Sequence, residues 1–287
     1  KAFEEIEFWP QEKVDMVCQA VGYALTQEDV RITLGNLAVD ESGIGKKEDK
    51  IAKIYNKTLG TLWDQKGVKT CGMISEDKEM GIRTFAKPMG VIANVVPCTN
   101  PESTICCLAL STIKTRNAMI VTPHPRTQRT SYETVQYIRK ALEKVGAPVD
   151  LVQCIKNTSH AATSGLMAAL AKVVFAAGKP SHTVGAGNVV SIVDKSADLA
   201  SAAGKIRISK IANNSASCSS ENAVAIYETK YDEMLEELKK QKGYLLSTDE
   251  RETLRKYMWP DGEHLNRDVV AKPATVIAQA AGISVPA

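Results

Sequence analysis

The chain has 287 residues, enough for one large or two ordinary domains with a sizeable core. An apolar fraction of 44% and a charged fraction of 24% are typical of a globular protein. The net charge of +3, from 36 basic and 33 acidic residues, is too small to indicate a protein that binds nucleic acid or a membrane surface.

The cysteines do not form a metal-binding pattern. Seven of them are scattered along the chain without a CxxC pair, and none of the four histidines lies at ligand spacing from one. We therefore predict no zinc or other metal site. The sequence has no secretory signal and no apolar run long enough to cross a bilayer. These features favour a cytoplasmic protein with reduced thiols.

The first third of the chain predicts helices and a hairpin. Residues 11–65 have helical periodicity in three segments, and Gly43 and Gly45 separate the second segment from the third. Residues 69–86 then predict two short strands around the turn 75–81.

From residue 89 the pattern changes to an alternation of strands and helices. The predicted strands are 90–97, 118–125, 149–155, 181–193 and 222–227. The predicted helices are 101–117, 130–146, 159–179, 197–212, 230–241, 248–257 and 270–281. Apolar strands that alternate with helices predict an α/β fold, with a parallel sheet covered by helices on both faces.

Three predicted strands end in polar, turn-forming residues: "VVPCTNPEST", "VTPHPRT" and "VGAGN". Ligands of open α/β sheets bind beyond the carboxyl ends of the strands, although each loop alone is also compatible with simple helix capping. The "GAGN" loop is not a GxGxxG fingerprint, so it does not predict an ordinary Rossmann phosphate loop. His124 and His182 are possible general bases, but a lone loop histidine more often makes a structural hydrogen bond.

One cysteine has an unusual setting. Cys218 lies in "NNSASCSSEN", between serines, whereas a core cysteine normally has apolar neighbours. Cys98, Cys106 and Cys107 are rival nucleophiles, but the latter two lie in an apolar helical segment, where burial raises the pKa of a thiol. Cys218 is therefore the preferred candidate for a reactive thiol.

Several motifs in one order resemble the CoA-acylating aldehyde dehydrogenases. They are "LAVDESGIGKKEDKIAK", "KTCGMISEDKEMG", "PCTNPESTICCLALSTIKTRNAMIVTPHPR", "AAGKPSHTVGAGN" and "NNSASCSSENAVAIYE". The resemblance covers the whole chain. It includes the acetaldehyde dehydrogenase half of the bifunctional aldehyde–alcohol dehydrogenases and the acylating succinate semialdehyde and sulfoacetaldehyde dehydrogenases. It does not identify the aldehyde or decide between NAD and NADP.

The resemblance implies roles for individual residues. Cys218 matches the nucleophile that attacks the aldehyde, and Asn100 matches the side-chain donor of the oxyanion hole. The implied cofactor-binding residues are Thr122, Pro123 and His124 in one loop and Gly185, Ala186 and Gly187 in another.

A missing carboxylate points to coenzyme A as the acyl acceptor. Hydrolytic aldehyde dehydrogenases have an "ELGG" glutamate that activates water, and Gly185 stands at that position here. We therefore expect the thioester on Cys218 to await the thiol of coenzyme A. Glu221 follows closely, but the predicted strand after it is expected to direct it elsewhere. A hydrolytic enzyme and a non-catalytic scaffold or filament protein are the alternatives.

The resemblance also implies an aldehyde dehydrogenase-like architecture. We expect a Rossmann-type cofactor domain at 1–188, an incomplete catalytic domain at 189–287, and a homodimer or higher homo-oligomer built with the 69–86 hairpin. The family has a further strand after about Ala169 and more chain after Ala287. We therefore expect the natural chain to be longer, which intact-protein mass spectrometry would test.

Overall fold

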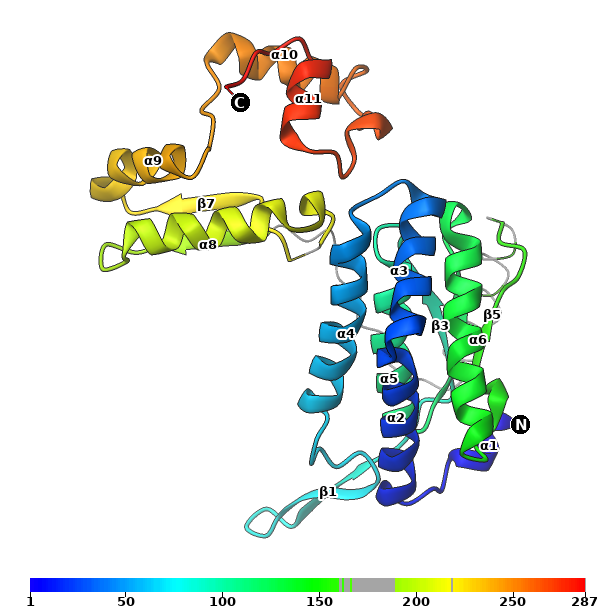
Figure 1. Ribbon diagram of the computed structural model, residues 1–287. Coiled ribbons are helices and arrows are strands. Elements are labelled where there is room, and N and C mark those ends of the chain that lie inside the picture. Colours follow the sequence, from blue (N-terminus) through cyan, green and yellow to red (C-terminus); the bar gives the residue numbers. More distant parts are fainter. Residues whose placement is uncertain (160–161, 163–165, 167–188, 218, 287) are drawn as a thin grey trace. The chain divides into compact units, whose positions relative to one another are not determined.

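A computed structural model describes residues 1–159, 162, 166, 189–217 and 219–286 (Figure 1). The chain divides into two compact units, Lys1–Gly43 with Lys47–His182 and Ile44–Lys46 with Thr183–Ala287. The predicted boundary at residue 188 and most of the predicted helix 159–179 lie outside the described residues. The assignment of 1–188 and 189–287 as domains therefore stays a prediction.

The first unit begins with four helices. They are α1 (Ala2–Ile6), α2 (Gln11–Thr26), α3 (Glu28–Ser42) and α4 (Lys47–Asp64). The three long ones confirm the helical periodicity of residues 11–65, whereas the short α1 was not predicted. Gly43 ends α3 because its φ of +69° is left-handed, a conformation in which glycine has no Cβ penalty.

The predicted hairpin is confirmed. Strands β1 (Gly72–Asp77) and β2 (Ile82–Ala86) pair antiparallel, and Asp77 Oδ1 accepts hydrogen bonds from the backbone N–H groups of Glu79 and Met80 in the turn. Almost every residue of both strands is exposed, and the hairpin extends away from the helices of its unit (Figure 1). The apolar side chains of Met73, Ile82 and Phe85 are therefore open to solvent.

A three-stranded parallel sheet follows, in the order β3 (Val91–Val95), β4 (Ala118–Thr122) and β5 (Val152–Cys154). The connections contain α5 (Pro101–Lys114) and α6 (Gln128–Lys144). The predicted parallel α/β pattern is thus confirmed. The third strand is shorter than the predicted 149–155 because its first residues form the 3₁₀ turn Val149–Leu151.

Helix packing gives this unit one continuous core. In Figure 1, α2 and α3 follow one another end to end between α4 on one side and α6 on the other, and α5 packs against α2, α4 and α6. On α2 the buried residues Val14, Val17, Val21 and Leu25 recur every three or four positions, which places them on one face. Such spacing buries one face of the helix and leaves the opposite face in contact with water.

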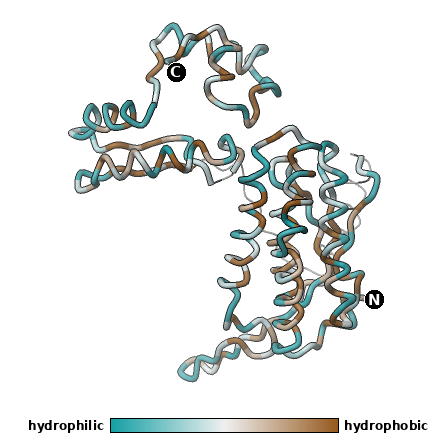
Figure 2. The backbone as a smooth tube through the Cα atoms, in the orientation of Figure 1, coloured by the Kyte–Doolittle hydropathy of each residue, from teal (hydrophilic) through white to brown (hydrophobic). Residues whose placement is uncertain are grey.

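The second unit contains the parallel pair β6 (Val190–Val193) and β7 (Ala223–Ile226). Its helices are α8 (Leu199–Ile211), α9 (Tyr231–Lys240), α10 (Thr248–Met258) and α11 (Ala274–Ala280). Helix α11 begins after Pro273 rather than at the predicted residue 270, which agrees with the preference of proline for helix starts. Most residues of α9 are hydrophilic, as the colours along its backbone show (Figure 2).

Within the described ranges, no helix has the length and apolar character needed to cross a membrane.

Candidate active site at the carboxyl edge of the sheet

The carboxyl ends of β3, β4 and β5 lie at one edge of the sheet. Val95 pairs with Thr122 in the parallel register. Beyond that pair, the Val96 N–H donates to the carbonyl of Thr122 over 3.1 Å, and the Ile155 N–H donates to that of Val121 over 2.9 Å. The loops that follow the three strands therefore start side by side, at the position where open α/β sheets bind ligands.

Asn100 marks the start of α5 at this edge. It is the residue before Pro101, the first helical residue, and its carbonyl accepts a hydrogen bond from the Thr104 N–H over 3.1 Å. Proline at the first helical position has a φ suited to the helix and no N–H to leave unpaired. Asn100 is 7% exposed as a whole residue, so little of it meets water.

A buried charged pair lies directly beside Asn100. Lys50 of α4 donates hydrogen bonds from Nζ to Asn100 Oδ1, over 3.3 Å, and to the carbonyl of Thr99. Glu102 Oε1 lies 3.8 Å from the same Nζ, and neither charged side chain has any exposed surface. Desolvation lowers the pKa of Lys50 and raises the pKa of Glu102, because burial disfavours the charged form of each.

Thr122 ends β4 with a buried hydroxyl. The residue is 1% exposed, and among the described residues its buried Oγ1 has no hydrogen-bond partner. A buried polar atom without a partner is costly, so this hydroxyl suits a bound group that supplies one. Pro123 is buried next to it, and His124 Nδ1 accepts a hydrogen bond from the Arg126 N–H over 3.1 Å. The predicted loop Thr122–His124 thus adjoins the Asn100 loop.

The N-terminus of α6 already carries a protein carboxylate. Glu41 of α3 accepts hydrogen bonds from the backbone N–H groups of Arg129 and Thr130, over 2.8 and 2.7 Å, and from the Thr130 hydroxyl over 2.6 Å. A helix N-terminus is otherwise a natural phosphate site. Because Glu41 uses these donors, a nucleotide phosphate does not have them available.

The predicted nucleophile Cys218 and the predicted loop Gly185, Ala186 and Gly187 lie outside the described residues. The segment before Cys218 has an uncommon backbone, since Asn213, Asn214 and Ser215 all have φ between 49° and 59°. Left-handed conformations at consecutive non-glycine residues are strained and occur most often at functional sites.

Glu221 is held as a carboxylate. Hydrogen bonding from the Ser209 side chain lowers the pKa of Glu221, and its own backbone N–H acts in the same direction. A lowered pKa makes the carboxylate a weaker base, which agrees with the expectation that Glu221 does not activate water. It lies two residues before β7, which begins at Ala223.

Burial distinguishes one of the rival cysteines. Cys106 on α5 is completely buried, and desolvation raises the pKa of its thiol far above the usual range. Cys107 is half-buried, with Sγ 3.7 Å from the carbonyl oxygen of Lys57, and Cys98 is half-buried in the Asn100 loop. The expected burial is therefore confirmed for Cys106 and wrong for Cys107, and Cys98 remains a rival to Cys218.

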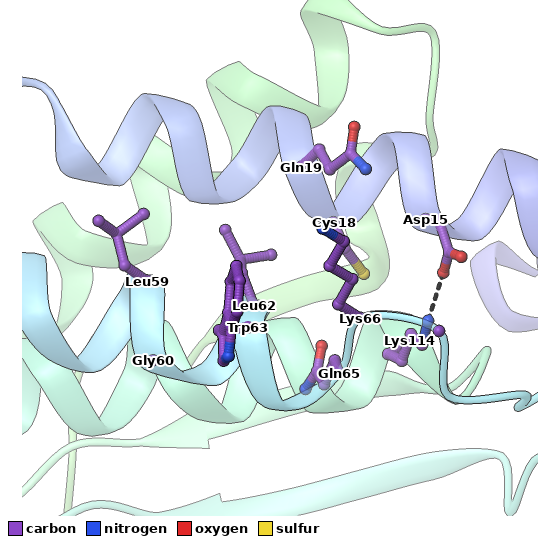
Figure 3. Close-up of a pocket in the computed structure, with 11 residues that line it drawn as sticks. Asp15, Cys18, Gln19, Leu59, Gly60, Leu62, Trp63, Gln65, Lys66 and Lys114 are labelled. Carbon is purple, nitrogen blue, oxygen red and sulfur yellow. Dashed lines mark hydrogen bonds and ion pairs between the residues drawn. The ribbon is translucent and has the colours of Figure 1, made fainter.

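The cavity drawn in Figure 3 belongs to another part of the first unit. It has a volume of about 580 Å³ and lies between α2 and the end of α4, with Trp63 and Lys66 on one side and Cys18 on the other. Lys114, which pairs with Asp15 there, ends α5. A helix rises about 1.5 Å per residue, so this cavity and Asn100 are at opposite ends of α5.

The sequence profile of the aldehyde dehydrogenase family matches residues 46–253. The chain belongs to the aldehyde dehydrogenase family. It is 38% identical to the acylating sulfoacetaldehyde dehydrogenase of Bilophila wadsworthia, over all of this chain and 65% of that protein. It is 34% identical to the acetylating succinate-semialdehyde dehydrogenase of Clostridium kluyveri, over 99% of this chain and 65% of that protein.

The fold is likewise that of an acylating member. The crystal structure of an acetylating aldehyde dehydrogenase from Geobacillus thermoglucosidasius superposes with a TM-score of 0.87 at 33% identity, over all of this chain and 66% of that one. The resemblance to CoA-acylating aldehyde dehydrogenases and the fold that it implied are thus confirmed. This aldehyde dehydrogenase chain spans slightly less than two thirds of the length of these curated relatives.

Proposed function

We propose that this protein is a CoA-acylating aldehyde dehydrogenase, which converts an aldehyde, coenzyme A and NAD(P)⁺ to acyl-CoA, NAD(P)H and a proton. The observation that carries the proposal is the buried Asn100 amide at the start of α5, at the carboxyl edge of the sheet. Relatives named as acylating and acetylating enzymes support it.

In the proposed mechanism, the Cys218 thiolate attacks the aldehyde carbonyl and forms a thiohemiacetal. Asn100 stabilises the negative charge that develops on the carbonyl oxygen, as a donor in a site shielded from water. When bound, the nicotinamide supplies the acceptor for the hydride. The resulting thioester on Cys218 is then attacked by the thiol of coenzyme A, which releases acyl-CoA and regenerates the Cys218 thiol.

Thr122, Pro123 and His124 form the proposed nucleotide-binding loop, together with Gly185, Ala186 and Gly187. The buried Thr122 hydroxyl suits a hydrogen bond to the nucleotide, because no described protein group satisfies it. We propose NAD or NADP as the nucleotide and a short-chain or acid-bearing aldehyde, such as acetaldehyde, succinate semialdehyde or sulfoacetaldehyde, as the substrate. The exposed apolar residues of the β1–β2 hairpin support a homo-oligomer.

The decisive measurement uses the complete protein with a panel of aldehydes, each assayed with NAD and with NADP by absorbance of the reduced nucleotide. Coenzyme A is present or omitted. We expect steady turnover only with coenzyme A, and at most one equivalent of NAD(P)H per active site without it, because Gly185 supplies no base for water. Steady formation of the free acid without coenzyme A would show a hydrolytic enzyme instead.

The nucleophile is tested in the same assay. Cys218→Ala is expected to abolish NAD(P)H formation while nucleotide binding is retained. Cys98→Ala is the matched control, because Cys98 is a half-buried cysteine in the Asn100 loop. Loss of the burst in Cys98→Ala, with a normal burst in Cys218→Ala, would assign the chemistry to Cys98.

A further inference from the structure

Lys50 is an unusual residue to find without any exposed surface. A buried ammonium loses its hydration, and lysine is almost never fully buried unless it is paired. Its counterion, Glu102, is equally buried, with Oε1 at 3.8 Å from Lys50 Nζ. Buried ion pairs contribute little net stability, because desolvation offsets most of their attraction. Stability alone therefore gives a poor explanation for a lysine at this position.

The hydrogen bonds of Lys50 all reach one short piece of chain. The ammonium donates hydrogen bonds to the Thr99 carbonyl and to Asn100 Oδ1, over 3.3 Å to the latter, and it forms an ion pair with Glu102 Oε1. These groups lie between the end of β3 and the first turn of α5. Lys50 comes from a different helix, so it ties this turn to α4.

The contact with Asn100 determines how its amide is oriented. A protonated lysine only donates, so it can bond to the carbonyl oxygen of an amide but not to its nitrogen. Asn100 Oδ1 therefore faces Lys50, and Nδ2, the other end of the planar amide, points away from the ammonium. An oxyanion requires the N–H donors of that nitrogen, since two oxygen atoms would repel each other.

The positive charge also changes the strength of the donor. A cation bonded to the oxygen of an amide draws electron density from its nitrogen, and linked hydrogen bonds of this kind strengthen one another where the dielectric constant is low. Asn100 is 7% exposed and Lys50 is fully buried, so water screens this effect little.

We propose that Lys50 is a positioning residue for Asn100, which orients the amide and strengthens its N–H donors toward the oxyanion of the thiohemiacetal. This inference rests on the proposed function, because it assigns Lys50 a role only through the oxyanion hole. Glu102 neutralises the charge that this arrangement buries.

The test is a double-mutant cycle in the complete protein between Lys50→Met and Asn100→Ala. Lys50→Met is always combined with Glu102→Gln, so that no variant of the cycle leaves a buried charge of this pair without its partner. The readouts are the rate of the NAD(P)H burst at saturating aldehyde and nucleotide, the KM for aldehyde, and the thermal midpoint. Lys47→Met is the control on the same helix, because Lys47 pairs with Asp40 in an exposed contact.

We expect Asn100→Ala to slow the burst by about 10²–10³-fold, as for one lost oxyanion donor. When Asn100 is present, Lys50→Met is expected to slow the burst by roughly tenfold, which is part of the loss caused by Asn100→Ala. When residue 100 is alanine, Lys50→Met is expected to slow the burst by less than about twofold. The KM for aldehyde changes little in both backgrounds, since the lost interaction belongs to the transition state. Lys47→Met is expected to leave the burst unchanged.

Two results would contradict the inference in distinguishable ways. If Asn100→Ala leaves the burst rate unchanged, the oxyanion role of Asn100 fails, and the role of Lys50 fails with it. If Asn100→Ala slows the burst but Lys50→Met slows it by the same factor with and without Asn100, the two residues act independently. The proposed function then stands, and the inference about Lys50 is wrong. Should Lys50→Met not fold, Lys50→Gln replaces it in the cycle. It keeps a neutral donor, so its rate is expected to lie between those of lysine and methionine.

Discussion

The thiol of Cys18 lies inside the first unit, 3% exposed, with Sγ 3.6 Å from the carbonyl oxygen of Leu110. Burial raises the pKa of this thiol to about 12, and burial also raises that of Cys154 to about 12. Because the thiolate is the nucleophilic form, we expect these cysteines to react slowly in the folded protein. Burial therefore sets Cys18 and Cys154 apart from the proposed nucleophile.

This difference predicts a pattern of alkylation. At pH 8 only about one Cys18 thiol in ten thousand is ionised when its pKa is about 12, and raising the pH to 9 increases that fraction only tenfold. In native protein treated with iodoacetamide and mapped by mass spectrometry, we expect no labelling of Cys18 between pH 7 and 9. Cys218 is expected to be labelled at a rate that rises with pH through its own pKa. The same treatment in denaturant provides the control, and rapid native labelling of Cys18 would contradict the assignment.

At the scale of secondary structure, α6 depends on a residue from another helix. Its N-cap, Thr127, makes no side-chain capping hydrogen bond, whereas Glu41 of α3 accepts bonds from two backbone N–H groups of the first turn. The carboxylate also lies at the positive end of the helix dipole. Glu41 therefore fixes α6 relative to α3 and positions the loop that follows β4.

Removal of this cap is expected to destabilise the first unit. Glu41→Ala leaves the N–H groups of Arg129 and Thr130 without their acceptor, and loss of a helix cap typically costs about 0.5–2 kcal/mol. The measurement is the free energy of unfolding in urea. Asp40→Ala is the matched control, since the exposed pair between Asp40 and Lys47 contributes roughly 0–1 kcal/mol. An equal loss in both variants would show that Glu41 does not cap α6.

At the scale of the whole molecule, the two units differ in how much core they contain. The buried cluster of the first unit draws on α1, α2, α3, α4, α5, α6, β4 and β5, and Ile92 of β3 packs against it. The cluster of the second unit, among its described residues, consists of Val193, Leu199, Ala203 and Met234. So small a cluster offsets little of the conformational entropy that ordering this unit costs.

We therefore expect residues 189–287 not to fold when expressed alone. Circular dichroism during heating would show no cooperative transition for this fragment, whereas the fragment 1–188, which contains the larger core, is the comparison and is expected to melt cooperatively. A sharp transition of 189–287 by itself would contradict this expectation.

Local patterns predicted most of the described elements. Helical periodicity identified α2, α3 and α4, and the alternation of strands and helices identified the parallel connections around β3, β4 and β5. Those signals are local, because helix and strand propensity, hydrophobic periodicity and the glycines that end helices all depend on residues close in the sequence. The predicted boundaries erred where a 3₁₀ turn precedes β5 and where Pro273 delays the start of α11.

The sequence by itself determined the family, through motifs that keep their order along the chain, and it singled out Asn100 at a strand end. It did not reveal Lys50, because "KKEDKIAK" has the charge density of a solvated helix surface. Glu41, likewise, lies in an ordinary acidic segment. Only the tertiary structure decided that one lysine of that run is buried against Asn100, because α4 packs on α5. Burial of a charge depends on partners fifty residues away, which no local pattern encodes.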